Sequence, residues 1–361
     1  MPQIKYALMG FGGIAENRIA KEGFGLDAAR VGTPKYAELV GATDVNPTRR
    51  AVVEKLGLKW YEKSDAVLAD PTIQAVFIAT NNRSHAPLAA AALEAGKHVL
   101  VEKPLAVSGT EARKLVELAT SRKLSLSVDH MMTKNVLNRK ARDMVYSGQL
   151  GTVNDACFHM EFAYGYDPAE AATWRCADPG ELGGPIGDVA SHCLYMAEYI
   201  FEQRVCSVAA TYYPKMMPMA VEDGAMVLAT LENGLTCSIR VSFRDFRGGL
   251  GGTLTGLGFE VFGSDAVLRS YGTLFQLSGY ADEPIRQRLE FDTFTKQENF
   301  FIDQPENIYQ AVIDEHAMSV LDGKPLSGEE GLHNVLLCES VHRSALQGGT
   351  VVEIASVSTS I

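Results

Sequence analysis

The first third of the chain alternates short apolar runs with amphipathic segments. The apolar runs predict buried strands at residues 4–9, 39–43, 75–80, 98–101 and 124–128. The amphipathic segments predict helices at residues 47–56, 86–95 and 109–122. Continuous apolar strands that alternate with helices are typical of a parallel sheet covered on both faces. We therefore expect an α/β domain over residues 1–128.

The pattern changes after residue 128. A helix is predicted at residues 135–146, and long strand-like segments follow at residues 152–163, 204–214, 224–231, 235–243 and 257–270. Successive strands without helices between them indicate an antiparallel sheet, so residues 129–361 are expected to form an α+β domain. Further helices at residues 187–201, 305–321 and 328–346 and a short strand at 350–354 complete the pattern, and the last helices could pack back on the first domain.

Two connections in the second domain have distinctive sequences. Glu232-Asn233-Gly234-Leu235 joins two predicted strands, and Asn-Gly favours a hairpin with a type I′ turn. The Gly-rich stretch at residues 247–258 is the segment that the sequence predicts to be a mobile loop.

Composition narrows the class of protein. The chain has 361 residues, of which 46% are hydrophobic and 21% charged, which fits two folded domains with a sizeable core. Lys and Arg number 33 against 44 Asp and Glu, so the net charge of −11 argues against a nucleic-acid partner. No apolar run reaches the ~18 to 20 residues of a membrane span, and the start does not resemble a secretory signal. The six cysteines include no C-x-x-C pair, so we expect reduced thiols, no metal site and a cytoplasmic protein.

A glycine-rich segment directly follows the first predicted strand. It contains Gly10, Phe11, Gly12, Gly13, Ile14 and Ala15 and fits the pattern G-x-G-x-x-A that opens a helix. The first glycine permits a tight turn, the second lets the backbone approach a pyrophosphate, and the small last residue lets the helix pack closely on the strand. This context predicts a dinucleotide-binding (Rossmann) domain.

The second predicted strand ends at Asp44, the candidate ligand of the adenosine ribose. A carboxylate there would accept hydrogen bonds from the ribose hydroxyls and favour NAD over NADP. The same residue could instead initiate the turn before Asn46-Pro47. Arg49 and Arg50 could grip a 2′-phosphate, so NADP stays open as the less favoured cofactor.

Two polar motifs are candidates for the chemistry. Residues 98–101 lead into Glu102-Lys103-Pro104, which puts a lysine at the carboxyl end of a strand, where open α/β sheets bind ligands. Farther on, Asp188 and His192 are four residues apart in a predicted helix and therefore share one face. Hydride transfer from an alcohol needs a base for the hydroxyl proton, and a histidine and an ammonium suit that reaction.

With these motifs the sequence resembles the Gfo/Idh/MocA oxidoreductase family, the family of glucose–fructose oxidoreductase and inositol dehydrogenase. The matching pieces are GFGGIA at residues 10–15, ATNNRSH at 79–85, EKP at 102–104, GGPIGDVASH at 183–192 and SGEEGLHNVLLCESVHRSA at 327–345. The resemblance implies a Rossmann domain joined to an open antiparallel sheet domain whose free face forms a homodimer or homotetramer. It also implies that Lys103 hydrogen-bonds the reacting oxygen, that His192 is the general acid and base, and that Asp188 orients His192 or positions the sugar.

The resemblance extends to further site residues. It implies that Thr80, Asn82, His85, Glu102 and Lys103 lie at the cofactor. It also implies that His130 and the pair Trp174 and Arg175 contact substrate, although His130 could be structural and an arginine stacked on tryptophan is ordinary packing. Asn81 stands where the family usually has proline, and the arginine of many relatives after the sixth strand is missing, so substrate identity does not transfer.

The expected function is NAD(P)-dependent hydride transfer at a secondary hydroxyl or ketone of a sugar or cyclitol. An NAD-dependent glycoside hydrolase, which works by transient oxidation and elimination, would use the same Lys103 and His192 and is the alternative. A non-catalytic sensor of this fold would not need Lys103, Asp188 and His192, so their retention argues against it.

Overall fold

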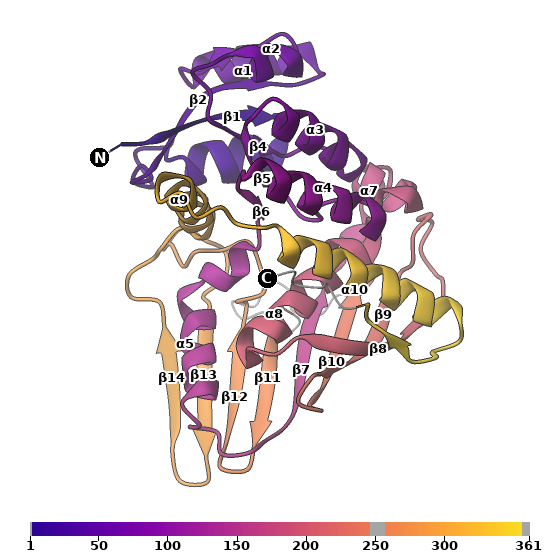
Figure 1. Cartoon of the computed structure of the whole chain (residues 1–361). Helices are drawn as coiled ribbons and strands as arrows, with labels where there is room; N and C mark the ends of the chain where they lie inside the picture. Colours follow the sequence, from indigo (N-terminus) through magenta and orange to yellow (C-terminus); the bar gives the residue numbers. More distant parts are fainter. Residues whose placement is uncertain (1, 246–256, 356–361) are drawn as a thin grey trace. The chain divides into compact units, whose positions relative to one another are not determined.

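The computed structural model describes residues 2–245 and 257–355, so nearly all of the Gly-rich stretch at residues 247–258 lies outside the described residues. The chain forms two compact units (Figure 1). The first contains Met1–Met131 and Asn307–Val335, and the second contains Met132–Glu306 and Leu336–Ile361. The first unit thus includes the chain up to Met131 and a helical segment from near the C-terminus.

The first unit is built on a six-stranded parallel sheet. Its strands are β1 (Ile4–Met9), β2 (Ala37–Thr43), β3 (Lys59–Trp60), β4 (Ala75–Ile78), β5 (His98–Val101) and β6 (Leu126–Val128). They lie in the order β3-β2-β1-β4-β5-β6, which is the order of dinucleotide-binding folds. The predicted strands of this domain are confirmed, whereas β3, with two residues, is too short to leave an apolar pattern in the sequence.

Helices cover both faces of this sheet. They are the π-helix η1 (Ala15–Gly23), the 3₁₀-helix η2 (Pro47–Arg49), α1 (Arg50–Lys55), α2 (Ser64–Ala69), α3 (Asn82–Glu94), α4 (Gly109–Arg122), α9 (Ile308–Leu321) and the start of α10 (Glu329–Leu346). Right-handed crossovers put η1 and the pair α3 and α4 on opposite faces, because the chain moves outward from β1 in one direction and from β4 in the other. Helix α9 packs beside η1, where the Tyr6 hydroxyl lies 2.6 Å from Nδ1 of the buried His316.

The second unit contains a nine-stranded mixed sheet, in the order β14-β13-β12-β11-β7-β10-β9-β8-β15. Its strands are β7 (Val153–Glu161), β8 (Val205–Tyr212), β9 (Gly224–Leu231), β10 (Thr236–Ser242), β11 (Leu257–Gly263), β12 (Ala266–Tyr271), β13 (Arg288–Thr293), β14 (Gln297–Phe301) and β15 (Val352–Glu353). The neighbouring strands are antiparallel except β7 and β10, which are parallel. The expected antiparallel domain is therefore confirmed, with one parallel pair inside it.

The prediction of one continuous strand over residues 257–270 is wrong. The chain reverses at Ser264 and Asp265 and forms the antiparallel pair β11 and β12. The Ser264 hydroxyl donates to the Asp265 carboxylate over 2.8 Å and thus stabilises the turn. Apolar residues on both sides of this two-residue turn make the two strands look continuous in the sequence.

The hairpin between β9 and β10 is confirmed, but its predicted type I′ turn is wrong. Only Gly234 has a positive φ, at +85°, whereas a type I′ turn needs a positive φ at both central residues. The Leu231 N–H donates to the Leu235 carbonyl, and the Asn233 side chain accepts from the Leu235 N–H. The loop is therefore three residues long, and Asn233 serves as a side-chain acceptor.

Helices α5 (Val136–Tyr146) and α8 (Ser191–Phe201) lie on one face of the larger sheet (Figure 1). This unit also contains the end of α10, η3 (Met131–Lys134), η4 (Tyr164–Tyr166), α6 (Pro168–Ala171), α7 (Trp174–Ala177), η5 (Pro179–Glu181) and the π-helical η6 (Pro185–Ala190). Side chains alternate along the strands, and Phe158, Ile239 and Phe259 on the helix-covered face are buried. On the opposite face Met226 and Leu228 remain 44% and 48% exposed.

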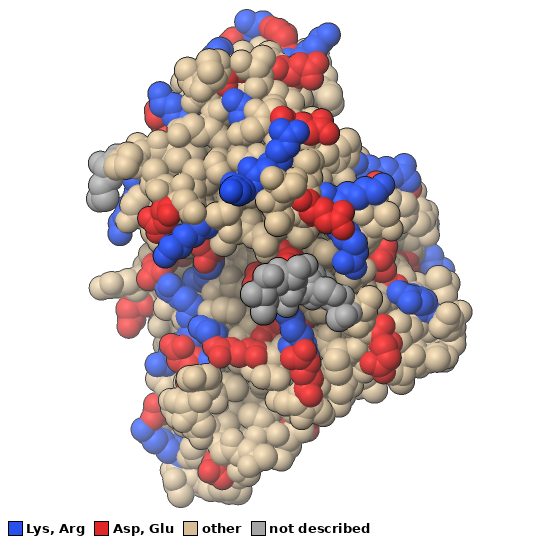
Figure 2. Space-filling view, viewed as in Figure 1, with Lys and Arg blue, Asp and Glu red and all other residues tan. Residues whose placement is uncertain are grey.

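The described surface carries charges of both signs. In the view of Figure 2, lysine and arginine side chains are interspersed with aspartate and glutamate and do not gather into one basic area. Among the described helices, none combines the length and the apolar character that crossing a membrane requires.

Candidate active site

The turn after β1 is shaped by glycines. Gly10 has φ +89°, and a Cβ on it would lie 2.5 Å from the Ala79 carbonyl oxygen, so only glycine fits this close approach to the end of β4. By contrast, a Cβ on Gly12 or Gly13 would meet no described atom within 4 Å. The backbone of these two residues can therefore be approached closely by a ligand at the start of the helical segment, as a pyrophosphate requires.

Asp44 connects the end of β2 to this turn. One oxygen of its carboxylate accepts from the Phe11 N–H at 2.6 Å, and the other accepts from the Asn46 N–H at 2.7 Å. Arg49 reaches the same place, since its Nε donates to the Phe11 carbonyl at 2.6 Å and its guanidinium pairs with Glu16. Asp44, which would favour NAD, and Arg49, which would favour a 2′-phosphate, thus both hydrogen-bond the backbone of Phe11. Arg50, the other candidate cation, is instead paired with Glu54 and Glu62.

His85 joins the loops that follow β4 and β5. The ring is fully buried, and its Nδ1 lies 2.7 Å from the Pro104 carbonyl oxygen. Its Nε2 lies 3.3 Å from the Thr80 carbonyl oxygen. His85 therefore fixes the loop that carries Thr80 relative to the loop that carries Lys103.

The predicted residues of the first unit follow the carboxyl ends of five neighbouring strands. The glycine turn follows β1, and Asp44 follows β2. Thr80 and Asn82 follow β4, Glu102 and Lys103 follow β5, and His130 follows β6. Since the carboxyl ends of parallel strands share one edge of the sheet, the fold gathers residues from positions 10 to 130 at the edge where such sheets bind ligands.

Tyr309, at the start of α9, is a neighbour of this edge that the sequence did not indicate. Burial raises the pKa of Tyr309 well above its usual range, and the charges of Glu102 and Asp129 add to the effect. The sequence could not have indicated it, because Tyr309 is separated from Glu102 by about two hundred residues and belongs to no motif.

In the second unit a glycine-rich turn leads into the helix that carries Asp188 and His192. Gly184 has φ +65°, and a Cβ on Gly187 would lie 1.8 Å from the Leu182 carbonyl oxygen. The chain continues as the π-helical η6 and then as α8. Such π-helical turns are frequent at functional sites.

Two groups of side chains form around this helix. Arg175 donates through Nε to the Asp188 carboxylate at 3.3 Å, and its guanidinium lies 4.5 Å from the centre of the Trp174 ring. His192 is buried, with 2% of its surface exposed, and its Nδ1 lies 2.8 Å from the Tyr195 hydroxyl. Tyr195 is thus a neighbour of the candidate base that motif reasoning missed, and its position three residues after His192 was the available signal.

The family follows from comparison with known proteins. A profile described as the oxidoreductase family with an NAD-binding Rossmann fold matches residues 4–130. A profile of the GFO/IDH/MocA C-terminal domain matches residues 138–269, so together they span more than half of the chain. The chain belongs to the Gfo/Idh/MocA oxidoreductase family. Membership confirms the resemblance drawn from the motifs.

Several curated relatives carry the names of sugar reductases or dehydrogenases. The chain is 29% identical over 206 residues to 1,5-anhydro-D-fructose reductase of Ensifer adhaerens, a match covering 56% of this chain and 59% of that protein. It is also 29% identical over 209 residues to the NADP⁺-dependent D-xylose 1-dehydrogenase of Hypocrea jecorina, covering 55% of this chain and 52% of that one. The chain therefore matches between half and three-fifths of the length of these curated relatives.

Solved structures of Gfo/Idh/MocA proteins share the fold along the whole chain. A levoglucosan dehydrogenase in complex with NADH and L-sorbose superposes with a TM-score of 0.80. The comparison covers 99% of this chain and 100% of that one at 19% identity, so it establishes the common architecture.

Proposed function

We propose that this protein is an NAD-dependent oxidoreductase that moves a hydride between nicotinamide and a secondary hydroxyl or ketone of a sugar or cyclitol. One observation carries the proposal: the glycine turn after β1 and Lys103 after β5 belong to the same ligand-binding edge of one parallel sheet. A dinucleotide-binding turn and an ammonium at one edge are the parts that hydride transfer to a carbonyl requires.

The residues at this edge fit a dinucleotide. The open backbone of Gly12 and Gly13 suits a pyrophosphate, and Asp44 would accept from the ribose hydroxyls. Thr80, Asn82, His85 and Glu102 would line or support the nicotinamide side. When bound, the nicotinamide supplies the hydride acceptor or donor for the reaction.

The chain's own residues would handle the substrate's oxygen and proton. The Lys103 ammonium would donate a hydrogen bond to the reacting oxygen and so stabilise developing negative charge. His192 would remove the hydroxyl proton during oxidation and return it during reduction. Asp188 would orient His192 or position the sugar, while Trp174, Arg175 and His130 would contact substrate. The pairing of Asp188 with Arg175 supports placing these two residues in one part of the site.

The choice of NAD rests on Asp44. At the ribose its carboxylate would repel the like charge of a 2′-phosphate, which would favour the unphosphorylated ribose. Arg49 is the opposing feature, but its guanidinium pairs with Glu16. We therefore propose NAD as the preferred cofactor and NADP as the weaker one.

We also propose that the protein forms a homodimer or homotetramer through the sheet of the second unit. Met226, Leu228 and Phe301 are 44%, 48% and 38% exposed on strands of this sheet. Exposed apolar side chains on one sheet face are typical of association surfaces.

The function is tested by mixing the purified protein with NAD⁺ and a panel of free sugars, cyclitols and their glycosides while following nicotinamide absorbance. Steady accumulation of NADH with a free polyol is the expected result. Release of the aglycone from a glycoside in an NAD-dependent manner, without net NADH, would replace this proposal by the hydrolase alternative.

A further inference from the structure

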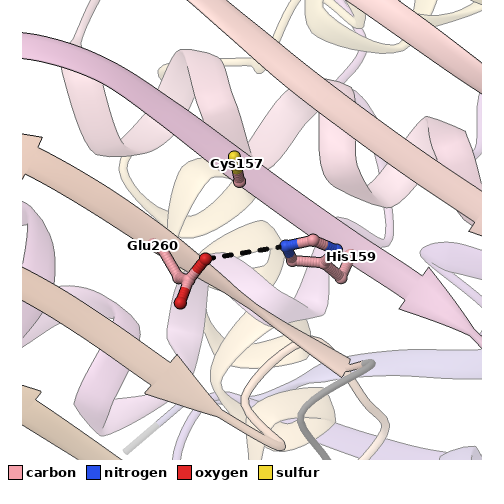
Figure 3. A group of neighbouring side chains, drawn as sticks. All are labelled: Cys157, His159 and Glu260. Carbon is pink, nitrogen blue, oxygen red and sulfur yellow. Dashed lines mark ion pairs between the residues drawn. The ribbon is translucent and has the colours of Figure 1, made fainter. Parts of the chain in front are cut away.

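Three side chains on the larger sheet form a cluster of potential metal ligands. Cys157 and His159 are two residues apart on β7 and therefore point to the same face. Glu260 on β11 is the direct antiparallel partner of Cys157. Their ligand atoms all lie within 4.8 Å of one another (Figure 3), and they form the one such group of three among the described residues.

The separations are close to those of a tetrahedral metal site. Zinc bonds of about 2.0 to 2.3 Å put neighbouring ligands roughly 3.3 to 3.8 Å apart. Nε2 of His159 already lies 3.9 Å from the Glu260 carboxylate. Ligand atoms that lie within 4.8 Å of one another would therefore need to approach by about 1 Å to close around one ion.

Each candidate ligand also contacts a neighbouring polar group. The Ser238 hydroxyl donates to Sγ of Cys157 at 2.9 Å, and the other oxygen of Glu260 lies 3.7 Å from Nε of Arg269. Nδ1 of His159 lies 3.7 Å from the buried carboxylate of Glu161, which leaves Nε2 to face Glu260. A carboxylate behind the second ring nitrogen orients metal-binding histidines and fixes their tautomer.

The donor types select the metal. Thiolate and imidazole together favour zinc over the hard cations magnesium and calcium, which take oxygen ligands. These three side chains lie on the sheet face that carries Leu228, and those of His159 and Glu260 keep 17% and 36% of their surface exposed in the single chain, so an ion could enter before copies of the chain associate. We propose that Cys157, His159 and Glu260 form a zinc site on this face. The site belongs to the sheet of the second unit and is independent of the proposed hydride transfer.

The test uses Co²⁺ as a spectroscopic probe on full-length protein freed of metal with a chelator. The expected result is one equivalent of bound Co²⁺, with the near-ultraviolet thiolate-to-cobalt band, and displacement of that band by Zn²⁺. Cys157→Ser should abolish the band, and Glu260→Gln should weaken binding at least ~10-fold.

A matched control is available in Cys206, a half-buried thiol on β8 that donates to the Thr230 carbonyl. Cys206→Ser should keep the band and the affinity. Absence of Co²⁺ and Zn²⁺ binding by the unmodified protein would overturn the proposal, and so would a thiolate band that survives Cys157→Ser. Circular dichroism shows whether each variant is folded. Glu260→Gln keeps the Cys157 thiol, so a weakened thiolate band in that folded variant reports loss of the site and not loss of the fold.

Discussion

The Tyr195 hydroxyl lies 2.8 Å from Nδ1 of His192, one helical turn along α8. The two rings are edge to face, with centres 5.4 Å apart. This hydrogen bond engages Nδ1 of a buried histidine, and in the reaction that we propose the proton would move through Nε2. Tyr195 would act as a positioning residue for the base.

Tyr195→Phe is therefore expected to lower kcat by about tenfold, because the imidazole loses the contact that holds its ring, and to leave the KM for NAD⁺ unchanged. Steady-state kinetics with the substrate found in the panel provide the measurement. Tyr199→Phe, on the same helix, is the control and should keep kcat. A change in the KM for NAD⁺ in Tyr195→Phe, or a fall of kcat in Tyr199→Phe as well, would contradict a positioning role.

Lys103→Ala should reduce kcat by ~10² or more, since the reacting oxygen loses its charged donor. Cofactor binding, followed by fluorescence titration with NADH, should persist. Lys114→Ala, an exposed lysine on α4, should behave like the unmodified protein. A kcat of Lys103→Ala equal to that of the unmodified protein would show that Lys103 does not stabilise the reacting oxygen.

Cofactor preference can be separated from loop support at Asp44. Asp44→Asn keeps an oxygen that accepts from the Phe11 N–H but gives up the contact with the Asn46 N–H and removes the charge, so the NAD/NADP ratio of kcat/KM should fall by about tenfold. Arg49→Gln should instead weaken NADP more than NAD. An unchanged ratio in both variants would place the ribose contact on other residues.

His316 makes the first unit sensitive to acid. Burial, with a smaller contribution from the nearby His98, lowers the pKa of His316 to about 3. In the unfolded state His316 has an ordinary pKa of about 6.5 and therefore binds a proton at a higher pH than in the folded state. Its contribution to the free energy of unfolding is fully present above pH 6.5 and is lost as the pH drops toward 3. Protonation of His316 in the unfolded state should lower the free energy of unfolding by about 1.4 kcal/mol for each pH unit in that window.

His316→Leu should remove this contribution to the slope between pH 6 and 4.5, despite a lower stability at neutral pH from the loss of the Tyr6 contact. Urea unfolding in a Trp174→Phe background measures it, because Trp60 then reports on the first unit alone. His342→Leu removes a half-exposed histidine that contacts the Tyr212 hydroxyl and should keep the slope. Equal slopes in all three proteins would disprove the assignment.

The association surface is tested at Leu228. Leu228→Asp puts a charge on the exposed sheet face and should convert the oligomer to monomers in light scattering. Leu346→Asp is the control, since Leu346 is 77% exposed at the end of α10 and should keep the assembly. A monomeric unmodified protein would exclude the proposed homo-oligomer.

The sequence by itself determined the parallel sheet, the glycine turn and the family. Periodicity and local motifs depend on neighbours within a few residues, and for the same reason Gly10, Lys103 and the pair Asp188 and His192 were identifiable as candidates. The hairpin was also predictable, whereas its turn type was not, because the φ of Asn233 depends on the loop length between paired strands.

Only the tertiary structure decided which distant residues become neighbours. The return of α9 brings Tyr309 to the edge that carries Glu102, and strand register puts Glu260 opposite Cys157. The absence of a C-x-x-C pair led to the expectation of no metal site; the sequence does place Cys157 two residues from His159, but only the strand pairing brings Glu260 to them. Pairing between strands is set by the packing of the whole sheet, and a linear pattern of residues does not contain it.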